Sequence, residues 1–258
     1  MHRDEVNVAG YEVLADIYEW LIPDAKLTPA GSVAALGDLV QSLPSNARIL
    51  DCSCGTGQLA VGLAGLGLDV VATDASSGMV RRTQKLADEH GLSLQALQVS
   101  WDDLSDHLDP STFDLLLCVG NSLVHAQGAS GRLAALAAMS RLLNPRGRLV
   151  LTSRTWEIVR AGGSRMDVWD RVVRRGSRDG VVIYSWQVED RWEQEHHLEI
   201  AVAQVEPDGS VLTCSERLSF WPYRYEELVA ELQTAGLRVQ ASTFNPDAEV
   251  YMIVAGKA

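Results

Sequence analysis

Short apolar segments alternate with amphipathic, helix-like segments along residues 48–153. Two strands joined through a helix run in the same direction, so this alternation predicts a mostly parallel sheet with helices on both faces. Short apolar runs predict the strands, and apolar residues at helical spacing predict the helices. The predicted strands are 48–51, 69–73, 93–99, 113–119 and 148–153, and the predicted helices between them are 58–66, 77–89 and 132–143.

The pattern changes after Arg154. Segments 180–193, 197–206 and 211–221 alternate apolar and polar residues, and Pro207-Asp-Gly-Ser210 is a turn sequence between the last two. Alternation of this kind predicts antiparallel strands, so we expect an antiparallel insertion after the fifth strand of the sheet. The α/β pattern then resumes with a predicted helix at 224–235 and two closing strands at 238–243 and 250–256, which brings the sheet to seven strands.

We interpret residues 1–258 as one α/β domain, because no linker or low-complexity tract separates two halves of the chain. Two helices, predicted at 13–21 and 32–43, precede the first strand. The insertion is expected to cover the carboxyl edge of the sheet, where open α/β sheets bind ligands. The predicted parts are an N-terminal helical cap (1–44), a core (45–160 and 224–258) and the antiparallel insertion (165–222).

The charge balance limits the partners. Lys and Arg number 22 against 34 Asp and Glu, which gives a net charge of −12. A negative field of this size repels nucleic acid and anionic membrane, so we expect a small-molecule substrate instead. The four cysteines are typical of reduced thiols in a cytoplasmic protein, and no signal peptide or membrane-spanning run is found. The charge balance does not decide whether the chain forms a homo-oligomer.

A glycine-rich turn follows the first predicted strand. Asp51-Cys-Ser-Cys-Gly55-Thr-Gly57 opens a helix, the context that favours a nucleotide-type binding loop, for NAD as well as for S-adenosylmethionine. A carboxylate at Asp51 suits a ligand with ammonium and sulfonium charges better than a pyrophosphate. Asp74 lies at the end of the second strand, where it could accept the hydroxyls of an adenosine ribose or, alternatively, cap the helix that begins near Ser76.

The motifs resemble those of class I S-adenosylmethionine-dependent methyltransferases, and among them glycine N-methyltransferases and their bacterial sarcosine and dimethylglycine relatives. The similarity covers residue 45 to the end, and Gly120-Asn-Ser-Leu-Val-His125 is its most specific element. It implies a Rossmann-like fold. The matching segments are Ile49–Gly57, Thr73–Met79, Ser100–Trp101, Cys118–His125, Ser153–Arg154, Leu218–Pro222 and Val250–Val254.

The resemblance also implies roles for individual residues. Asn121 would orient the acceptor amine, Arg154 would pair with an acceptor carboxylate, and His125 would lie near the methyl-donor pocket. Asp74 would hold the ribose, while Ala75 and Met79 would pack on the adenine. The remaining residues implied to bind the cofactor are Asp51, Ser53, Gly55, Gly57, Ser100, Trp101, Val119 and Gly120.

The chain departs from this family at three places. Ser100 stands where the family has an amide, Phe220-Trp221 stands where it has two tyrosines, and Lys26 lies where it uses an arginine for the methionine carboxylate. An altered amine acceptor therefore stays open. So do an O- or C-methyltransferase of secondary metabolism and a non-catalytic S-adenosylmethionine-binding protein, whereas an NAD oxidoreductase leaves the Gly-Asn-Ser-x-x-His motif unexplained.

No metal site is expected. His196 and His197, close to Glu193 and Glu195, look like a cluster of metal ligands. In an extended segment, however, neighbouring side chains point to opposite faces, so we place them at the surface. Methyl transfer from a sulfonium needs mainly alignment of a neutral nucleophile and exclusion of water, which fits the absence of a metal-ligand spacing.

Overall fold

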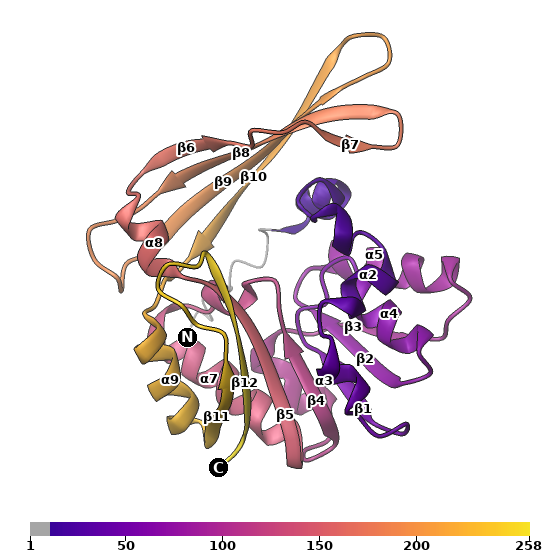
Figure 1. Cartoon of the computed structure of the whole chain (residues 1–258), viewed down its shortest axis with the longest axis vertical. Helices are drawn as coiled ribbons and strands as arrows, with labels where there is room; N and C mark the ends of the chain where they lie inside the picture. Colours follow the sequence, from indigo (N-terminus) through magenta and orange to yellow (C-terminus); the bar gives the residue numbers. More distant parts are fainter. Residues whose placement is uncertain (1–10) are drawn as a thin grey trace, which may run out of the picture.

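A computed structural model describes residues 11–258 and contains a seven-stranded sheet in the order β11-β12-β5-β4-β1-β2-β3 (Figure 1). Strand β12 runs antiparallel to its neighbours β5 and β11. The other pairs are parallel, which confirms the predicted mostly parallel α/β fold. The strands are β1 (Arg48–Asp51), β2 (Asp69–Asp74), β3 (Gln95–Gln98), β4 (Phe113–Cys118), β5 (Leu143–Arg154), β11 (Leu237–Ser242) and β12 (Val250–Lys257).

Helices cover both faces of this sheet. Ile49 and Leu50 are neighbours on β1, both are fully buried, and they belong to two different hydrophobic clusters because adjacent side chains point to opposite faces. Burial of each such side chain contributes about 1.5–3 kcal/mol relative to its exposure. The helices that complete the clusters are α4 (Gln58–Gly65) and α5 (Ser77–Glu89) on one face, and α7 (Gly128–Leu142) and α9 (Tyr225–Thr234) on the other.

A second, five-stranded antiparallel sheet follows β5 through the short helix α8 (Trp156–Ala161). Figure 1 shows it above the first sheet, at the end where β5 finishes. Its strands span residues 165–220, and it contains two short strands, β6 and β7, that the sequence did not predict. The strands are β6 (Arg165–Val168), β7 (Val173–Arg175), β8 (Arg178–Gln187), β9 (His196–Val205) and β10 (Val211–Phe220).

The N-terminal arm differs from the two predicted helices. Gly37 adopts a positive φ of 49°, which interrupts the segment predicted as one helix. Pro29 begins a separate helix whose N-cap, Thr28, accepts a hydrogen bond from Gly31 N. The arm therefore consists of short pieces, α1 (Leu14–Ile17), η2 (Tyr18–Trp20), η3 (Asp24–Lys26), α2 (Pro29–Ala34) and α3 (Asp38–Gln41).

The first part of this arm, up to η2, packs on the inner face of the second sheet. Leu14 and Trp20 are buried in one cluster with Val182 and Ile200 of that sheet. The approach is close: a Cβ atom on Gly180 would lie 2.5 Å from the Trp20 ring. Helices α1 and η2 thus pack under the second sheet, whereas residues of α2 and α3, such as Val33 and Leu39, pack in the cluster that α4 completes.

Smaller differences concern connections. Phe113 pairs with Leu143 and Leu115 pairs with Arg148, so residues 144–147, predicted as a turn before the strand, bulge out within β5. Four short helices lie outside the predictions: α8, η4 (Trp101–Asp103), α6 (Leu104–His107) and η5 (Ser122–His125). The division into cap, core and insertion of a single domain remains our proposal. No helix within residues 11–258 combines the length and the apolar character needed to cross a membrane.

Candidate functional site

Polar residues end four neighbouring parallel strands. Asp51 is the last residue of β1, Asp74 of β2 and Arg154 of β5, while Asn121 follows the end of β4 by three residues. Because β5, β4, β1 and β2 are adjacent and run in the same direction, these residues lie along one edge of the sheet. The structure therefore gathers residues that are 103 positions apart in sequence, at the edge where open α/β sheets bind ligands.

The glycine-rich turn connects β1 to α4. Gly55 and Gly57 have positive φ values of 54° and 90°. A Cβ atom on Gly57 would lie only 2.8 Å from Cα of Thr83 on α5, so this position requires glycine for packing as well as for conformation. Cys54 N donates to the Thr73 carbonyl over 3.0 Å, which fastens the turn to β2.

Asp51 is buried with an unsatisfied oxygen. Its side chain is 1% exposed, and within residues 11–258 its Oδ1 atom has no hydrogen-bond partner. Burial, reinforced by the negative charge of Asp74 and opposed by the Ser53 N–H, raises the pKa of Asp51 to about 7. A cationic group placed at this edge would offset the cost of ionising this carboxyl, so the site fits a ligand that carries ammonium and sulfonium charges.

Asp74 holds the glycine-rich turn. Its Oδ2 accepts from Gly55 N over 2.9 Å, and its Oδ1 accepts from Ser76 N over 3.0 Å. The N-cap of α5 is Ser76 itself, whose hydroxyl accepts from Met79 N. Asp74 is partly exposed, and a carboxylate has further lone pairs, so its oxygens can accept additional hydrogen bonds from a ligand.

The residues predicted to surround the adenine follow β2 and β3. Asp74 pairs with Gln98, so Ala75 and Ser100 follow the ends of adjacent strands. Met79 is buried in α5. The Trp101 indole donates to the Cys52 carbonyl over 2.8 Å, whereas the Ser100 hydroxyl donates to Asp103 over 2.7 Å.

A tight turn carries Asn121. Gly120 and Asn121 both have left-handed conformations, with φ of 80° and 66°. Gly120 N donates to Thr152 of β5 over 2.8 Å, and the Ser122 hydroxyl donates to the Val119 carbonyl over 2.7 Å. Ser53 also donates to this carbonyl over 3.3 Å, so the turn after β4 is fastened to its neighbours on both sides.

Tyr11 and His125 form a hydrogen-bonded pair. Nδ1 of His125 lies 2.7 Å from the Ser219 carbonyl, which can only accept, so Nδ1 carries the proton. Nε2 therefore accepts from the Tyr11 hydroxyl over 2.8 Å. Burial lowers the pKa of His125, which keeps the imidazole neutral, and burial raises the pKa of Tyr11. Sequence reasoning selected His125 but missed Tyr11, because no local pattern distinguishes this tyrosine.

The arm also places Glu12 beside Asp74. Its carboxylate accepts from Gly78 N over 3.1 Å and from the Ser76 hydroxyl over 2.9 Å. The Gly78 N–H lowers the pKa of Glu12 most, followed by its serine hydrogen bonds. Sequence reasoning missed Glu12, which lies 64 positions from Ser76. Lys26 is exposed in η3 and forms no ion pair within residues 11–258.

A row of aromatic rings from the second sheet lies next to Arg154. Its guanidinium carbon lies 5.9 Å from the Trp186 ring centre, and it has no carboxylate partner within the described part of the chain. Tyr184 contacts both Trp186 and Trp169 edge-on, each at 6.0 Å between ring centres. The second sheet therefore supplies an aromatic wall beside an unpaired cation.

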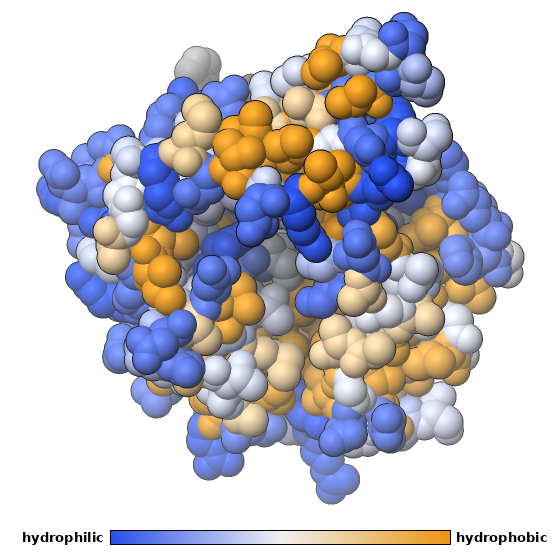
Figure 2. Space-filling view, turned by 45° about the horizontal axis from the view of Figure 1, so that its top comes forward, coloured by the Kyte–Doolittle hydropathy of each residue, from blue (hydrophilic) through white to orange (hydrophobic). Residues whose placement is uncertain are grey.

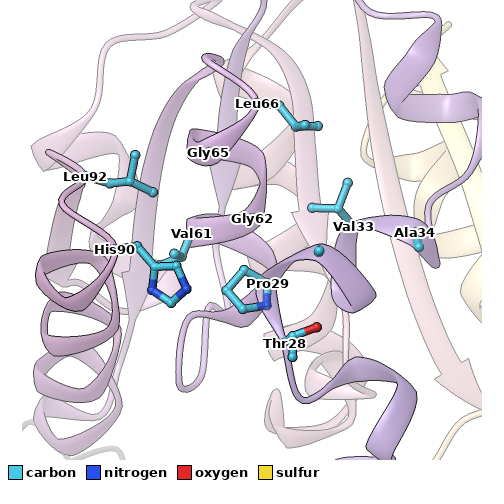
Figure 3. Close-up of a pocket in the computed structure, with 11 residues that line it drawn as sticks. Thr28, Pro29, Val33, Ala34, Val61, Gly62, Gly65, Leu66, His90 and Leu92 are labelled. Atoms are coloured by element: carbon cyan, nitrogen blue, oxygen red, sulfur yellow. The ribbon is translucent and has the colours of Figure 1, made fainter.

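Two surface pockets differ in their relation to this edge. One, of about 630 Å³, is lined by Pro23, Val168, Trp169, Asp170, Arg171 and Glu249. Glu249 precedes Val250, which pairs with Arg154, so this pocket opens beside the candidate site. The other, of about 500 Å³, lies between α2 and α4 (Figure 3) and is lined mainly by apolar residues such as Val33 and Leu66. It contacts none of the predicted site residues.

The histidines of β9 belong to no cluster of metal-ligating side chains among residues 11–258, and one of them is not on the surface. His196 is fully buried, so its predicted surface position is wrong. Its Nδ1 accepts from Glu189 N over 3.0 Å, and its ring packs against Phe220. His197 projects from the opposite side of the strand, as alternation requires. Within the described residues no group of three or more His, Cys, Asp or Glu side chains could hold a metal ion.

Comparison with known proteins gives a family match over part of the chain. Residues 49–147 match the family model of the methyltransferase domain. The chain is 34% identical over 159 residues to a glycine/sarcosine N-methyltransferase of Halorhodospira halochloris, which covers 60% of this chain and 56% of that relative. It therefore spans little more than half the length of this curated relative.

Two longer matches have lower identity. The chain is 25% identical over 207 residues to a ubiquinone biosynthesis O-methyltransferase of Methylococcus capsulatus, covering 78% of this chain and 85% of the relative. An amino pentose methyltransferase of Micromonospora echinaspora, solved with bound S-adenosylmethionine, superposes with a TM-score of 0.73 at 20% identity, covering 95% and 97% of the two chains. The structural similarity shows a shared fold.

Proposed function

We propose that this protein transfers a methyl group from S-adenosylmethionine to a small-molecule amine. The match to a methyltransferase domain supports a class I S-adenosylmethionine-dependent methyltransferase. The product from the donor would be S-adenosylhomocysteine. The observation that carries the proposal is the buried carboxyl of Asp51 beside the glycine-rich turn, with one oxygen that has no hydrogen-bond partner within residues 11–258. This group favours a cationic donor and disfavours the pyrophosphate of NAD.

The cofactor roles follow the strand ends. Asp74, which already accepts from Gly55 N, would receive the ribose hydroxyls. Ala75 and Met79 would pack on the adenine, with Trp101 at its edge. The methionine part of the cofactor would lie against the two turns after β1 and β4, because glycines allow close approach of backbone to ligand. The residues that would line it are Ser53, Gly55, Gly57, Val119 and Gly120.

The donor, when bound, supplies an activated methyl group. The chain's own task is then to hold a neutral nucleophile in line and exclude water. Asn121 would orient the acceptor amine by accepting a hydrogen bond from its N–H, which leaves the nitrogen lone pair free to attack. The Tyr11 hydroxyl is positioned to relay a proton to the neutral Nε2 of His125, which would favour the unprotonated amine.

Arg154 supports an acidic acceptor. Its guanidinium has no carboxylate partner within residues 11–258 and is held near the Trp186 ring. A substrate carboxylate would provide a charge-assisted, bidentate partner. An amino acid such as glycine or sarcosine meets this requirement, and the 34% identity to a glycine/sarcosine N-methyltransferase supports the same choice.

A hydroxyl acceptor is the second candidate. The ubiquinone biosynthesis O-methyltransferase aligns over 78% of this chain, and the aromatic side chains of Trp169, Tyr184 and Trp186 would suit an aromatic acceptor. The Tyr11–His125 pair could remove a phenol proton as well as an ammonium proton. A C-methyltransferase or a non-catalytic S-adenosylmethionine-binding protein is a weaker candidate. A protein that only binds S-adenosylmethionine would not need Asn121 and Arg154, the side chains proposed to hold the acceptor.

One assay separates these candidates. Purified protein would be incubated with S-adenosylmethionine carrying a labelled methyl group and with a panel of amines, amino acids and phenols. We expect label in amino acids or other amines. Label confined to phenols would replace the amine by a hydroxyl acceptor, and titration calorimetry that detects NAD but not S-adenosylhomocysteine would overturn the methyltransferase reading itself. The absence of nucleic-acid partners and the cytoplasmic location stay predictions from the charge and the cysteines.

A further inference from the structure

The second sheet has an inner face and an outer face. Its inner face carries Val182, Ile200 and Val202, which pack against the N-terminal arm. The alternation of a strand then places Val181 and Ile183 on the outer face. No described element buries these two residues completely, since both remain partly exposed.

The outer face is apolar across several strands. Ile183 pairs with Val168 on one side and with Ala201 on the other, while Val205 pairs with Val211. The exposed fractions are 54% for Val168, 46% for Val205 and 62% for Val211, and a further apolar residue, Met166, is 67% exposed. In Figure 2, hydrophobic residues gather in the upper part of the molecule, where the second sheet lies. We call this surface the outer patch; it consists of Met166, Val168, Val181, Ile183, Ala201, Ala203, Val205 and Val211.

Such a surface is unusual for a sheet that faces water. A solvated face of an antiparallel sheet normally carries polar residues opposite the apolar core face. Contiguous apolar surfaces beyond a few hundred Å² mark interaction sites on soluble proteins. The outer patch joins residues of four strands, so it is not a set of isolated exposed side chains.

The charges around the outer patch indicate its partner. At one end, Glu199 of β9 lies opposite Arg217 of β10. At the other, Arg174 and Asp179 form a salt bridge of 2.7 Å. Each of these two pairs is neutral, although the whole chain has a net charge of −12. A surface without excess positive charge suits neither nucleic acid nor anionic lipid, whereas it is complementary to itself under a two-fold rotation.

We propose that the outer patch is the interface with a second copy of this chain, in a two-fold symmetric dimer whose second sheets pack face to face. Sheets pack about 10 Å apart with interdigitating apolar side chains, which is what the outer patch offers. The inner face of the same strands carries Tyr184 and Trp186, next to Arg154. Because one strand carries both faces, dimerisation would stabilise the aromatic side chains beside Arg154 without placing a residue of the second copy in the acceptor site.

The test measures mass in solution over a concentration series by sedimentation equilibrium. The wild-type protein is expected at twice its 28.1 kDa chain mass. Ile183→Asp places an unpaired carboxylate from each subunit in the interface and is expected to raise the dimer Kd by about a hundredfold or more. Leu66→Asp is the matched control, since Leu66 is 60% exposed and directly follows α4, outside the outer patch. It should leave the dimer intact.

Thermal unfolding followed by circular dichroism establishes that each variant is folded. If Ile183→Asp does not fold, Val211→Asp takes its place, because Val211 is already 62% exposed and a charge there meets solvent in the isolated chain. A folded variant that sediments as a monomer supports the proposal. A monomeric wild-type protein, or a dimer that persists in a folded outer-patch variant, would overturn it. Neither outcome depends on methyl transfer, so the interface and the proposed function fail separately.

Discussion

Tyr11 donates its hydroxyl hydrogen to Nε2 of His125 over 2.8 Å, although 114 positions separate them in the sequence. Tyr11 precedes the short helices of the N-terminal arm, and His125 ends η5 after β4. His125 is in turn bonded through Nδ1 to Ser219 of β10. One imidazole therefore joins the arm, the first sheet's edge and the second sheet.

The first prediction tests this pair. Tyr11→Phe removes the donor to Nε2 and His125→Ala removes the ring, so both should lower kcat by about a hundred- to ten-thousandfold, the range for general acid–base groups. Because the pKa of His125 is lowered from 6.5, the acidic limb of the wild-type rate profile should lie below that pH. The check is the pH profile of methyl transfer. His107→Ala, at an exposed histidine, is the control; variants with unchanged kcat would remove the pair from the mechanism.

The second prediction concerns Asp51. Since its pKa is about 7, the carboxyl is protonated below that pH and ionised above it. A cationic donor binds the ionised form better, so S-adenosylmethionine affinity should fall, by up to about tenfold per pH unit, as the pH drops below about 7. Calorimetry across pH 5–9 measures this. Asp51→Asn should bind weakly with no such dependence; a wild-type profile flat through pH 7 contradicts the assignment.

A third variant addresses the ribose. Asp74→Ala should weaken S-adenosylhomocysteine binding by about 1.5–3 kcal/mol, the range for hydrogen bonds to a charged group. Asp69→Ala is a matched control, because Asp69 begins the same strand with an exposed side chain that only pairs with Arg48. Circular dichroism checks the fold. Equal affinities for both folded variants would leave Asp74 with only its structural role, holding Gly55 N and Ser76 N.

The fourth prediction separates acceptor from cofactor. Arg154→Lys keeps the charge but loses the planar fork, and Arg154→Gln loses both. We expect kcat/KM for an acidic acceptor to fall roughly ten- to a hundredfold, more for Gln than for Lys, with cofactor affinity unchanged. Wild-type enzyme should prefer the acid over its carboxamide, and Arg154→Gln should lose most of that preference. Arg146→Gln, at an exposed site in β5, is the control; equal use of acid and carboxamide by the wild type would exclude an amino acid acceptor.

A fifth prediction concerns stability. A Cβ atom at Gly180 would lie 2.5 Å from the Trp20 ring and 3.0 Å from the Ala203 carbonyl. Gly180→Ala should therefore destabilise the protein by about 1–3 kcal/mol, the usual cost of overpacking. Gly65→Ala, where the nearest atom is 3.9 Å away, should be neutral or slightly stabilising. Urea unfolding compares the two variants. Equal unfolding midpoints would show that the N-terminal arm shifts to accept the extra methyl group without loss of stability.

Local patterns in the sequence were sufficient for the first sheet and for most of its edge. The order of strands and helices follows from periodicity, and parallel strands place their ends together, so Asp51, Asp74, Asn121 and Arg154 could be located without coordinates. Helix α5 was predicted with its observed bounds, because Ser76 is a strong N-cap and the apolar spacing is clear. In each case the signal and the structure lie within the same short segment.

What only the tertiary structure decided is contact between distant segments. Burial of His196, the partners of Tyr11 and Glu12, and the division of the arm into short helices depend on surfaces that other parts of the chain supply. The same holds for the outer patch, since alternation on β8 looks equally apolar on both faces until the arm covers one of them. A sequence therefore determines which elements form and where their ends meet, whereas the free energy of packing selects which faces become buried, and that selection has no local signature.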